Sequence, residues 1–247
     1  MDTLRISAVS YLNTIPFVYG ILESGFVDNF RLELDVPSVC SRNLLNGEVD
    51  IALVPVGAIP DFTHYHLIGD YCIGAVSKVR TVLLLSHVPM EKISKVHLDW
   101  DSRTSVQLVQ VLAEKYWHIH PEWIRLQSGD AEQPGATESL VAIGDKTFDL
   151  APKFEYIYDL AEEWIRFTSL PFVFAVWMSK EILPSEILRN FNKALEYGVS
   201  HKKETIQFFR NKIQPGIDPY DYLNNNISFG FDDDKKKGLE LFLSFLK

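Results

Sequence analysis

The segment SAVSYLNTIPF (7–17) carries four hydrogen-bonding side chains directly after an apolar stretch. In an open parallel sheet, ligands bind beyond the carboxyl ends of the strands, so these groups would face a ligand. The same groups can instead satisfy a turn and cap the helix that Pro16 begins. Taken alone, the segment favours capping by Ser10 and Asn13. The four residues are Ser10, Tyr11, Asn13 and Thr14.

A second polar cluster lies in DWDSRTSVQL (99–108), at a strand-to-helix junction. Free backbone N–H groups and the positive end of the helix dipole make such a junction a site for a carboxylate or phosphate. Capping by Ser102 or Thr104 alone is an equally good explanation. Three hydroxyls and a cation exceed what one cap requires, so anion binding remains open. The candidate residues are Ser102, Arg103, Thr104 and Ser105, with Asp101 beside them.

Two further candidates follow from position. Gly144 and Asp145 come after the apolar run SLVAI, where Asp145 can cap the next segment, accept a substrate hydroxyl or pair with Lys146. Ser77 stands at the entrance to the apolar run 81–86, where a lone serine is usually structural.

Several catalytic and metal motifs are missing from the sequence. It has no glycine-rich phosphate loop, no H-E-x-x-H and no G-x-S-x-G. The two cysteines, Cys40 and Cys72, and the scattered histidines lack metal-ligand spacing. We therefore expect neither a metal nor a cofactor.

Length and charge restrict the partners. A chain of 247 residues with 47% hydrophobic residues can bury one large core or two ordinary ones. A net charge of -9 without a basic stripe argues against nucleic acid and anionic membranes. The N-terminus has no signal-peptide pattern, and no run reaches the roughly 18–20 apolar residues of a membrane span. We expect a cytoplasmic protein, monomeric or homodimeric.

Strand-like and helix-like segments alternate along the chain. Residues 4–9, 31–36 and 49–56 read as strands, separated by helices at 16–25 and 38–47, the second capped by Ser38. This βαβαβ start predicts a parallel sheet with helices on both faces.

Two continuous apolar runs, 81–86 and 172–178, flank a second α/β set, and the chain then turns helical to its end. The simplest architecture has two α/β lobes, with the chain crossing near 86 and returning near 177. Residues 1–86 plus 178–247 would form a discontinuous lobe I, and residues 87–177 lobe II. A ligand would sit in the cleft between hinge-closing lobes.

Taken together, five segments resemble the menaquinone-biosynthesis family of the futalosine route, and more narrowly its chorismate dehydratases. The resemblance implies a type II periplasmic-binding-protein-like fold with two crossing hinge strands. It also implies loss of water from chorismate, giving 3-[(1-carboxyvinyl)oxy]benzoate. The segments are SAVSYLNTIPF, DIALVPVGAIP (50–60), SRTSVQL (102–108), AIGDKTF (142–148) and LPFVFAVW (170–177).

The resemblance also suggests roles for the candidate residues. Asn13 would contact the reacting part of the substrate, and Ser77 would lie near the leaving hydroxyl or the enolpyruvyl carboxylate. Thr104 and Ser105 would hold a carboxylate, while Asp145 would hold the ring or act as the base. Without a histidine in these motifs, the substrate's own enolpyruvyl carboxylate is the favoured base.

Two other functions stay open. One is the sister enzyme of the same route, which makes 1,4-dihydroxy-6-naphthoate and is expected to need a strong base, such as histidine, in its cleft. The other is a small-anion binding protein that performs no chemistry.

Overall fold

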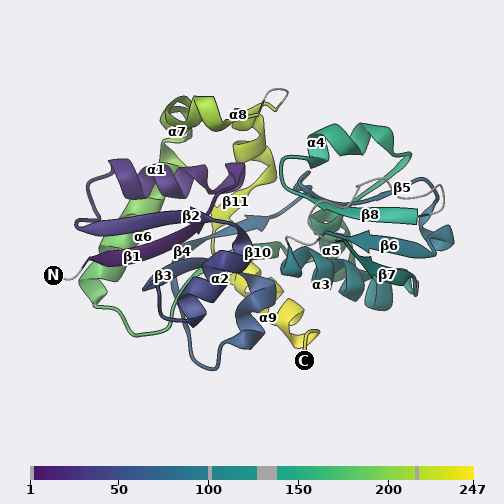
Figure 1. Cartoon of the computed structure of the whole chain (residues 1–247), viewed down its shortest axis with the longest axis horizontal. Helices are drawn as coiled ribbons and strands as arrows, with labels where there is room; N and C mark the ends of the chain where they lie inside the picture. Colours follow the sequence, from purple (N-terminus) through teal and green to yellow (C-terminus); the bar gives the residue numbers. More distant parts are fainter. Residues whose placement is uncertain (1–2, 100–101, 127–137, 215–216) are drawn as a thin grey trace.

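The computed structural model describes residues 3–99, 102–126, 138–214 and 217–247. Within these residues the strands form two sheets, and each sheet with its helices makes one lobe of an elongated molecule (Figure 1). The predicted two-lobed α/β architecture is therefore present.

The first lobe contains a six-stranded sheet in the order β11-β4-β10-β3-β1-β2. Strands β1, β2 and β3 pair in parallel, whereas β10 and β11 pair antiparallel to their neighbours. The strands are β1 (Leu4–Val9), β2 (Phe30–Asp35), β3 (Ile51–Pro55), β4 (His66–Ala75), β10 (Phe172–Ser179) and β11 (Ser228–Gly230). The helices are α1 (Ile15–Glu23), α2 (Pro37–Leu45), α6 (Ser185–Ser200), α7 (Lys202–Phe209), α8 (Pro219–Asp221) and α9 (Asp233–Ser244).

The second lobe is built on a five-stranded sheet in the order β7-β6-β8-β5-β9. Here β6, β7 and β8 are parallel, whereas β5 runs antiparallel to both of its neighbours. The strands are β5 (Val82–Ser86), β6 (Lys95–Leu98), β7 (Glu122–Arg125), β8 (Glu138–Ile143) and β9 (Tyr156–Asp159). The helices are α3 (Arg103–Leu112), α4 (Thr147–Leu150) and α5 (Leu160–Thr168).

The chain crosses between the sheets earlier than the sequence predicts. Strand β5 belongs entirely to the second sheet, so the first crossing lies between 75 and 82 instead of near 86. Strand β10 belongs entirely to the first sheet, so the return lies between 159 and 172 instead of near 177. Strands β5 and β10 are both buried. Their hydropathy therefore does not show which of the two sheets each one joins. Sheet membership thus places both crossings before the positions expected near 86 and 177. The division into a discontinuous lobe I and a lobe II stays a prediction.

Two local predictions also need correction. Helix α2 begins at Pro37 with Val36 as its N-cap residue, so Ser38 lies inside the first turn and does not cap it. Proline is favoured at this first position because its fixed φ suits the helix and its missing N–H is not needed there. The C-terminal part is not wholly helical, since the short strand β11 pairs with β4.

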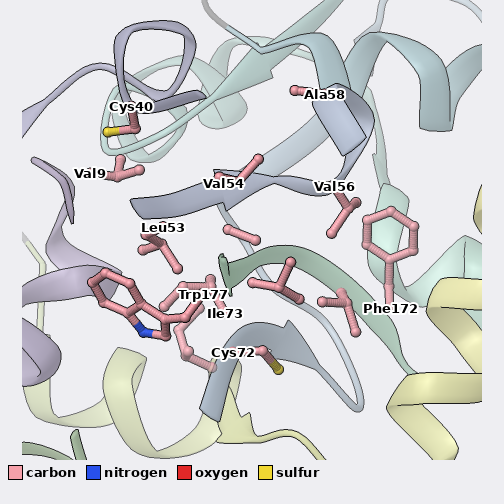
Figure 2. Close-up of a cluster of buried hydrophobic side chains, with 14 of the residues drawn as sticks. Val9, Cys40, Leu53, Val54, Val56, Ala58, Cys72, Ile73, Phe172 and Trp177 are labelled. Carbon is pink, nitrogen blue, oxygen red and sulfur yellow. The ribbon is translucent and has the colours of Figure 1, made fainter. Parts of the chain in front are cut away.

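The core of the first lobe forms where β3, β4 and β10 lie side by side (Figure 2). Leu53, Ile73 and Trp177 are at most 3% exposed there. Leu53 and Ile73 also line the cavity between the lobes, so part of this core forms the apolar floor of that cavity.

Helix α1 is fixed against α6 by a close backbone contact at two glycines. A Cβ atom on Gly198 would lie 1.7 Å from the carbonyl oxygen of Pro16, and one on Gly20 would lie 1.9 Å from that of Ala194. Only glycine permits this approach. Because α1 directly follows the polar turn at residues 12–14, the contact also fixes where that turn lies.

Candidate active site

A cavity lies between the lobes and is lined from both of them. The turn after β1 and the crossing segment before β5 reach it, as do the first turn of α3 and the turn after β8. Seven of the ten predicted site residues line it: Tyr11, Asn13, Ser102, Thr104, Ser105, Gly144 and Asp145. The sequence therefore identified segments that the fold brings together.

The polar turn after β1 does not cap a helix with its side chains. Residues Leu12–Thr14 form a 3-10 turn that runs into α1, and neither its N-cap, Tyr11, nor that of α1, Thr14, makes a side-chain cap bond. Thr14 Oγ1 instead donates to Asn13 Oδ1 at 3.1 Å. Capping by Ser10 and Asn13 is thus wrong, because Pro16 and the preceding 3-10 turn start the helix without them.

The first turn of α3 has both a cap and spare donors. Ser102 is the N-cap residue, and its Oγ accepts from the Ser105 N–H at 3.1 Å while donating to Ser105 Oγ at 2.8 Å. The Val106 N–H donates to the Ser102 carbonyl. The N–H groups of Arg103 and Thr104 have no partner within the helix because they belong to its first turn. Together with the Ser105 hydroxyl, they suit a carboxylate.

Thr104 also joins the two lobes. Its Oγ1 accepts a hydrogen bond from the Gly57 N–H at 3.0 Å, in the turn Val56–Asp61 after β3. The threonine hydroxyl keeps its own proton for donation to a ligand.

Three predicted residues lie away from the cavity lining. Arg103 forms an ion pair with Asp61 of the first lobe, with 48% of the arginine side chain exposed. Ser10 is exposed, and its N–H donates to the Asp35 carbonyl. Ser77 is exposed in the crossing segment between β4 and β5. Asp101 lies outside the described residues, and the binding roles of these groups stay predictions.

Asp145 brings a carboxylate to the cavity from the turn after β8. It does not cap α4, whose N-cap residue is Lys146, and Lys146 pairs with Asp99 at 2.6 Å. Burial raises the pKa of Asp145 above its ordinary value. Of the three roles that the sequence left open, capping is thus ruled out, and acceptance of a substrate hydroxyl stays a prediction.

The sequence missed two polar residues of the cavity lining, Thr81 and Tyr222. Their hydroxyl oxygens lie 2.9 Å apart, and Tyr222 is fully buried. Thr81 is the first residue of the apolar run 81–86, where a single threonine gives only a weak indication of a site. Tyr222 lies in the polar stretch DPYDYLNNN, which no motif distinguishes.

Asp159 ties the two crossing segments together beside the cavity. Its carboxylate accepts hydrogen bonds from the Val79 and Arg80 N–H groups at 3.2 and 2.7 Å. It also caps α5 by accepting from the N–H groups of Ala161 and Glu162. One buried side chain thus contacts both segments in which the chain crosses between the lobes. Burial raises the pKa of Asp159, although the four N–H groups oppose the shift.

The chemistry available in the cavity is hydrogen bonding from neutral donors, together with one carboxylate. Among the described lining residues there is no Lys, Arg or His. The described part of the chain also holds no group of three or more His, Cys, Asp or Glu side chains suited to a metal ion. Its helices include none that is long and apolar enough to cross a membrane. The cavity suits a small anion with an apolar ring.

Two sequence similarities each cover nearly the whole chain. The sequence profile of a family described as menaquinone biosynthesis matches residues 4–247. A chorismate dehydratase of Thermus thermophilus is 24% identical over 267 residues, covering 96% of this chain and 92% of that protein.

Solved structures share the fold at low sequence identity. A protein from Archaeoglobus fulgidus superimposes with a TM-score of 0.74 at 13% identity, over 98% of this chain and 96% of that one. The periplasmic aliphatic sulphonate binding protein SsuA from Escherichia coli gives a TM-score of 0.66 at 12% identity, over 99% and 87%. The predicted periplasmic-binding-protein-like fold is confirmed.

Proposed function

The chain belongs to the menaquinone-biosynthesis family, and from this premise we propose that it is a chorismate dehydratase, a carbon–oxygen hydro-lyase. The Thermus thermophilus relative that carries this name supports the proposal. The structural observation behind it is that Asn13, the first turn of α3 and Asp145 meet at one cavity. We further propose that the enzyme works in the cytoplasm, as a monomer or homodimer.

The proposed reaction removes one water from chorismate. A base takes the proton from ring C3, the C4 hydroxyl leaves, and the proton and hydroxyl together give water. The ring becomes aromatic, and the product is 3-[(1-carboxyvinyl)oxy]benzoate. Because aromatisation supplies driving force, the enzyme needs mainly to fix the reacting conformer and stabilise the departing hydroxyl.

One carboxylate of chorismate is proposed to bind at the start of α3. The Ser105 hydroxyl and the free N–H groups of that turn would donate to it, and Thr104 would add its own proton. The ring would lie on the apolar floor that includes Leu53 and Ile73. Neutral donors can hold a dianion without a cation because the helix terminus contributes positive potential.

Asn13 is proposed to contact the reacting part of the ring. Its carbonyl oxygen is engaged by Thr14, which leaves its amide N–H groups as donors. Ser77 would reach the leaving hydroxyl or the enolpyruvyl carboxylate only if the segment that carries it turned inward around the substrate.

Two bases are available for the C3 proton. One is the enolpyruvyl carboxylate of the substrate, and the other is Asp145, whose pKa is raised by burial. We favour the substrate carboxylate because it is attached, through the enolpyruvyl ether, to ring C3 itself. Asp145 would then accept a hydrogen bond from the substrate and orient the ring.

The test is to incubate the purified protein with chorismate alone and to follow ultraviolet absorbance and mass. Loss of one water, abolished by Asn13→Ala, is the expected result. If chorismate raises the melting temperature but stays intact, the cavity binds it and the proposed catalysis is wrong. If chorismate neither loses water nor raises the melting temperature, the proposed substrate is wrong.

A further inference from the structure

Asp61 of the first lobe contacts the second lobe through Arg103. It is the last residue of the 3-10 turn Val56–Asp61 after β3, and Arg103 is the first residue of α3. Nη1 and Nη2 of Arg103 donate to the two carboxylate oxygens of Asp61, the Nη2 bond to Oδ1 measuring 3.0 Å. A paired contact of this kind is more directional than a single hydrogen bond, because both groups are planar. The ion pair therefore joins the lobes in one defined geometry.

The turn that carries Asp61 is anchored in the first lobe. Four of its six residues are buried: Val56, Gly57, Ala58 and Ile59. The same turn contacts α3 a second time, since the Gly57 N–H donates to Thr104 Oγ1 at 3.0 Å. One anchored turn thus holds two adjacent residues of α3, Arg103 by its side chain and Thr104 by its hydroxyl.

The side chain of Arg103 lies outside the cavity, whereas its backbone belongs to the proposed anion site. With Asp61 it lines a separate groove, which shares Pro37 and Pro55 with the cavity lining. Its backbone N–H has no partner within the helix because it belongs to the first turn. This N–H is one of the donors proposed to bind the substrate carboxylate. Holding the guanidinium in the groove therefore also holds a donor of the cavity.

We propose that Asp61 is a positioning residue, which holds the first turn of α3 against the first lobe so that its backbone donors meet the substrate carboxylate. The inference rests on the proposed function, since it requires chorismate to bind at the start of α3. The ion pair forms only when the lobes are close together, and the substrate contacts both lobes in that same form. Ion pair and substrate therefore favour each other. Loss of the pair should raise KM and leave kcat nearly unchanged, because the bound enzyme is closed in either case.

Substitution of Asp61 with asparagine tests the proposal with chorismate as substrate. Asp61→Asn keeps the shape of the side chain and removes its charge. It should raise KM about threefold to fivefold with kcat within about twofold, a modest effect because the Arg103 and Asp61 side chains are 48% and 43% exposed. The matched control is Glu33→Gln, which removes the exposed ion pair between Arg31 and Glu33 within β2 and should leave KM unchanged.

Substitution of Arg103 distinguishes positioning from direct binding of the substrate. If Arg103 acts through Asp61, Arg103→Gln should raise KM as Asp61→Asn does, and in an Asp61→Asn background it should change KM by less than about twofold. If the guanidinium binds the substrate instead, Asp61→Asn would release it and lower KM, and Arg103→Gln would raise KM equally in both backgrounds. Either of these results, or an unchanged KM in Asp61→Asn, would overturn the proposal.

Small-angle scattering of the ligand-free protein gives a readout that does not depend on turnover. Asp61→Asn should have a larger radius of gyration than wild type because its lobes separate more easily, whereas Glu33→Gln should match wild type. If the wild-type protein leaves chorismate intact, the proposed function fails and the scattering alone decides whether Asp61 holds the lobes together. An unchanged radius in Asp61→Asn would then refute the positioning role. If the wild type is active, the KM values decide.

Discussion

The backbone N–H of Gly57 donates a hydrogen bond to Thr104 Oγ1 at 3.0 Å, joining the two lobes at the edge of the cavity. Thr104 stands in the first turn of α3, where the substrate carboxylate is proposed to bind. The same residue therefore contacts the opposite lobe and the proposed anion site. This links the approach of the lobes to the geometry of the site.

Replacing Gly57 with alanine should hold the lobes apart. The added Cβ would lie 2.9 Å from Thr104 Cα and 3.0 Å from its backbone nitrogen, where the neighbouring backbone would have to move. We expect KM for chorismate to rise about tenfold, since overpacking typically costs about 1–3 kcal/mol. Small-angle scattering should show a larger radius of gyration.

The matched control is Gly230→Ala in β11, where an added Cβ meets nothing within 4 Å. A Gly57→Ala protein with wild-type KM and wild-type radius would show that the contact has no part in substrate binding.

Replacing Asp145 with asparagine should stabilise the protein at neutral pH. Burial raises the pKa of this carboxyl above its ordinary value of 3.8, so the folded protein binds its proton more tightly than the unfolded chain. The folded protein therefore loses stability as the pH rises through the raised pKa of Asp145. Asp145→Asn should therefore melt higher than wild type at neutral pH, and the gap should close as the pH falls below 3.8. Thermal unfolding across this pH range measures the difference.

The same variant distinguishes the two possible bases. If the substrate carboxylate takes the C3 proton, Asp145→Asn should keep kcat within about tenfold of wild type, as for loss of one orienting hydrogen bond. Asp149→Asn, exposed in α4, is the control for a charge change in the same turn. A loss of several orders of magnitude with chorismate still bound would make Asp145 the base.

The sequence predicted the segments of the site better than the atoms within them. The alternation of apolar strands and helices correctly predicted β1, α1 and β3, and parallel strands bring the ends of such units to one edge. Whether a hydroxyl there caps a helix depends on backbone geometry that residue type does not specify. That is why Ser102 caps α3, whereas Ser10 caps nothing.

Tyr222 could not be predicted as a cavity residue from the sequence, because only tertiary packing brings it to the cavity. It is about 210 positions from Asn13 in a polar stretch, and the C-terminal part returns to the cavity only because β11 pairs with β4 and α9 packs on β10. The crossings expected near 86 and 177 differ from the sheet membership for a similar reason. Two buried apolar strands, β5 and β10, read alike in sequence yet join different sheets.

Removing the Asp159 carboxylate should weaken the hinge. Asp159→Ala would leave the Val79 and Arg80 N–H groups without their acceptor and would uncap α5. We expect the free energy of unfolding to fall by about 3 kcal/mol, since hydrogen bonds to a buried charged group contribute about 1.5–3 kcal/mol. Urea denaturation measures it. Asp159→Asn, which keeps one acceptor oxygen, should lose less, and equal losses in the two variants would contradict this account of the hinge.

Replacing Gly198 with alanine should separate α1 from α6. The new Cβ would lie 1.7 Å from the Pro16 carbonyl oxygen, a backbone atom that can move only if α1 moves. The loss of stability should reach or exceed the roughly 1–3 kcal/mol typical of overpacking. Because Pro16 is three residues after Asn13, kcat should fall as well, even at temperatures where the variant is fully folded. Ser200→Ala, on the same helix but exposed, should change neither the melting temperature nor kcat. A destabilised Gly198→Ala protein with wild-type kcat would show that the turn at Asn13 is held in place without the α1–α6 contact.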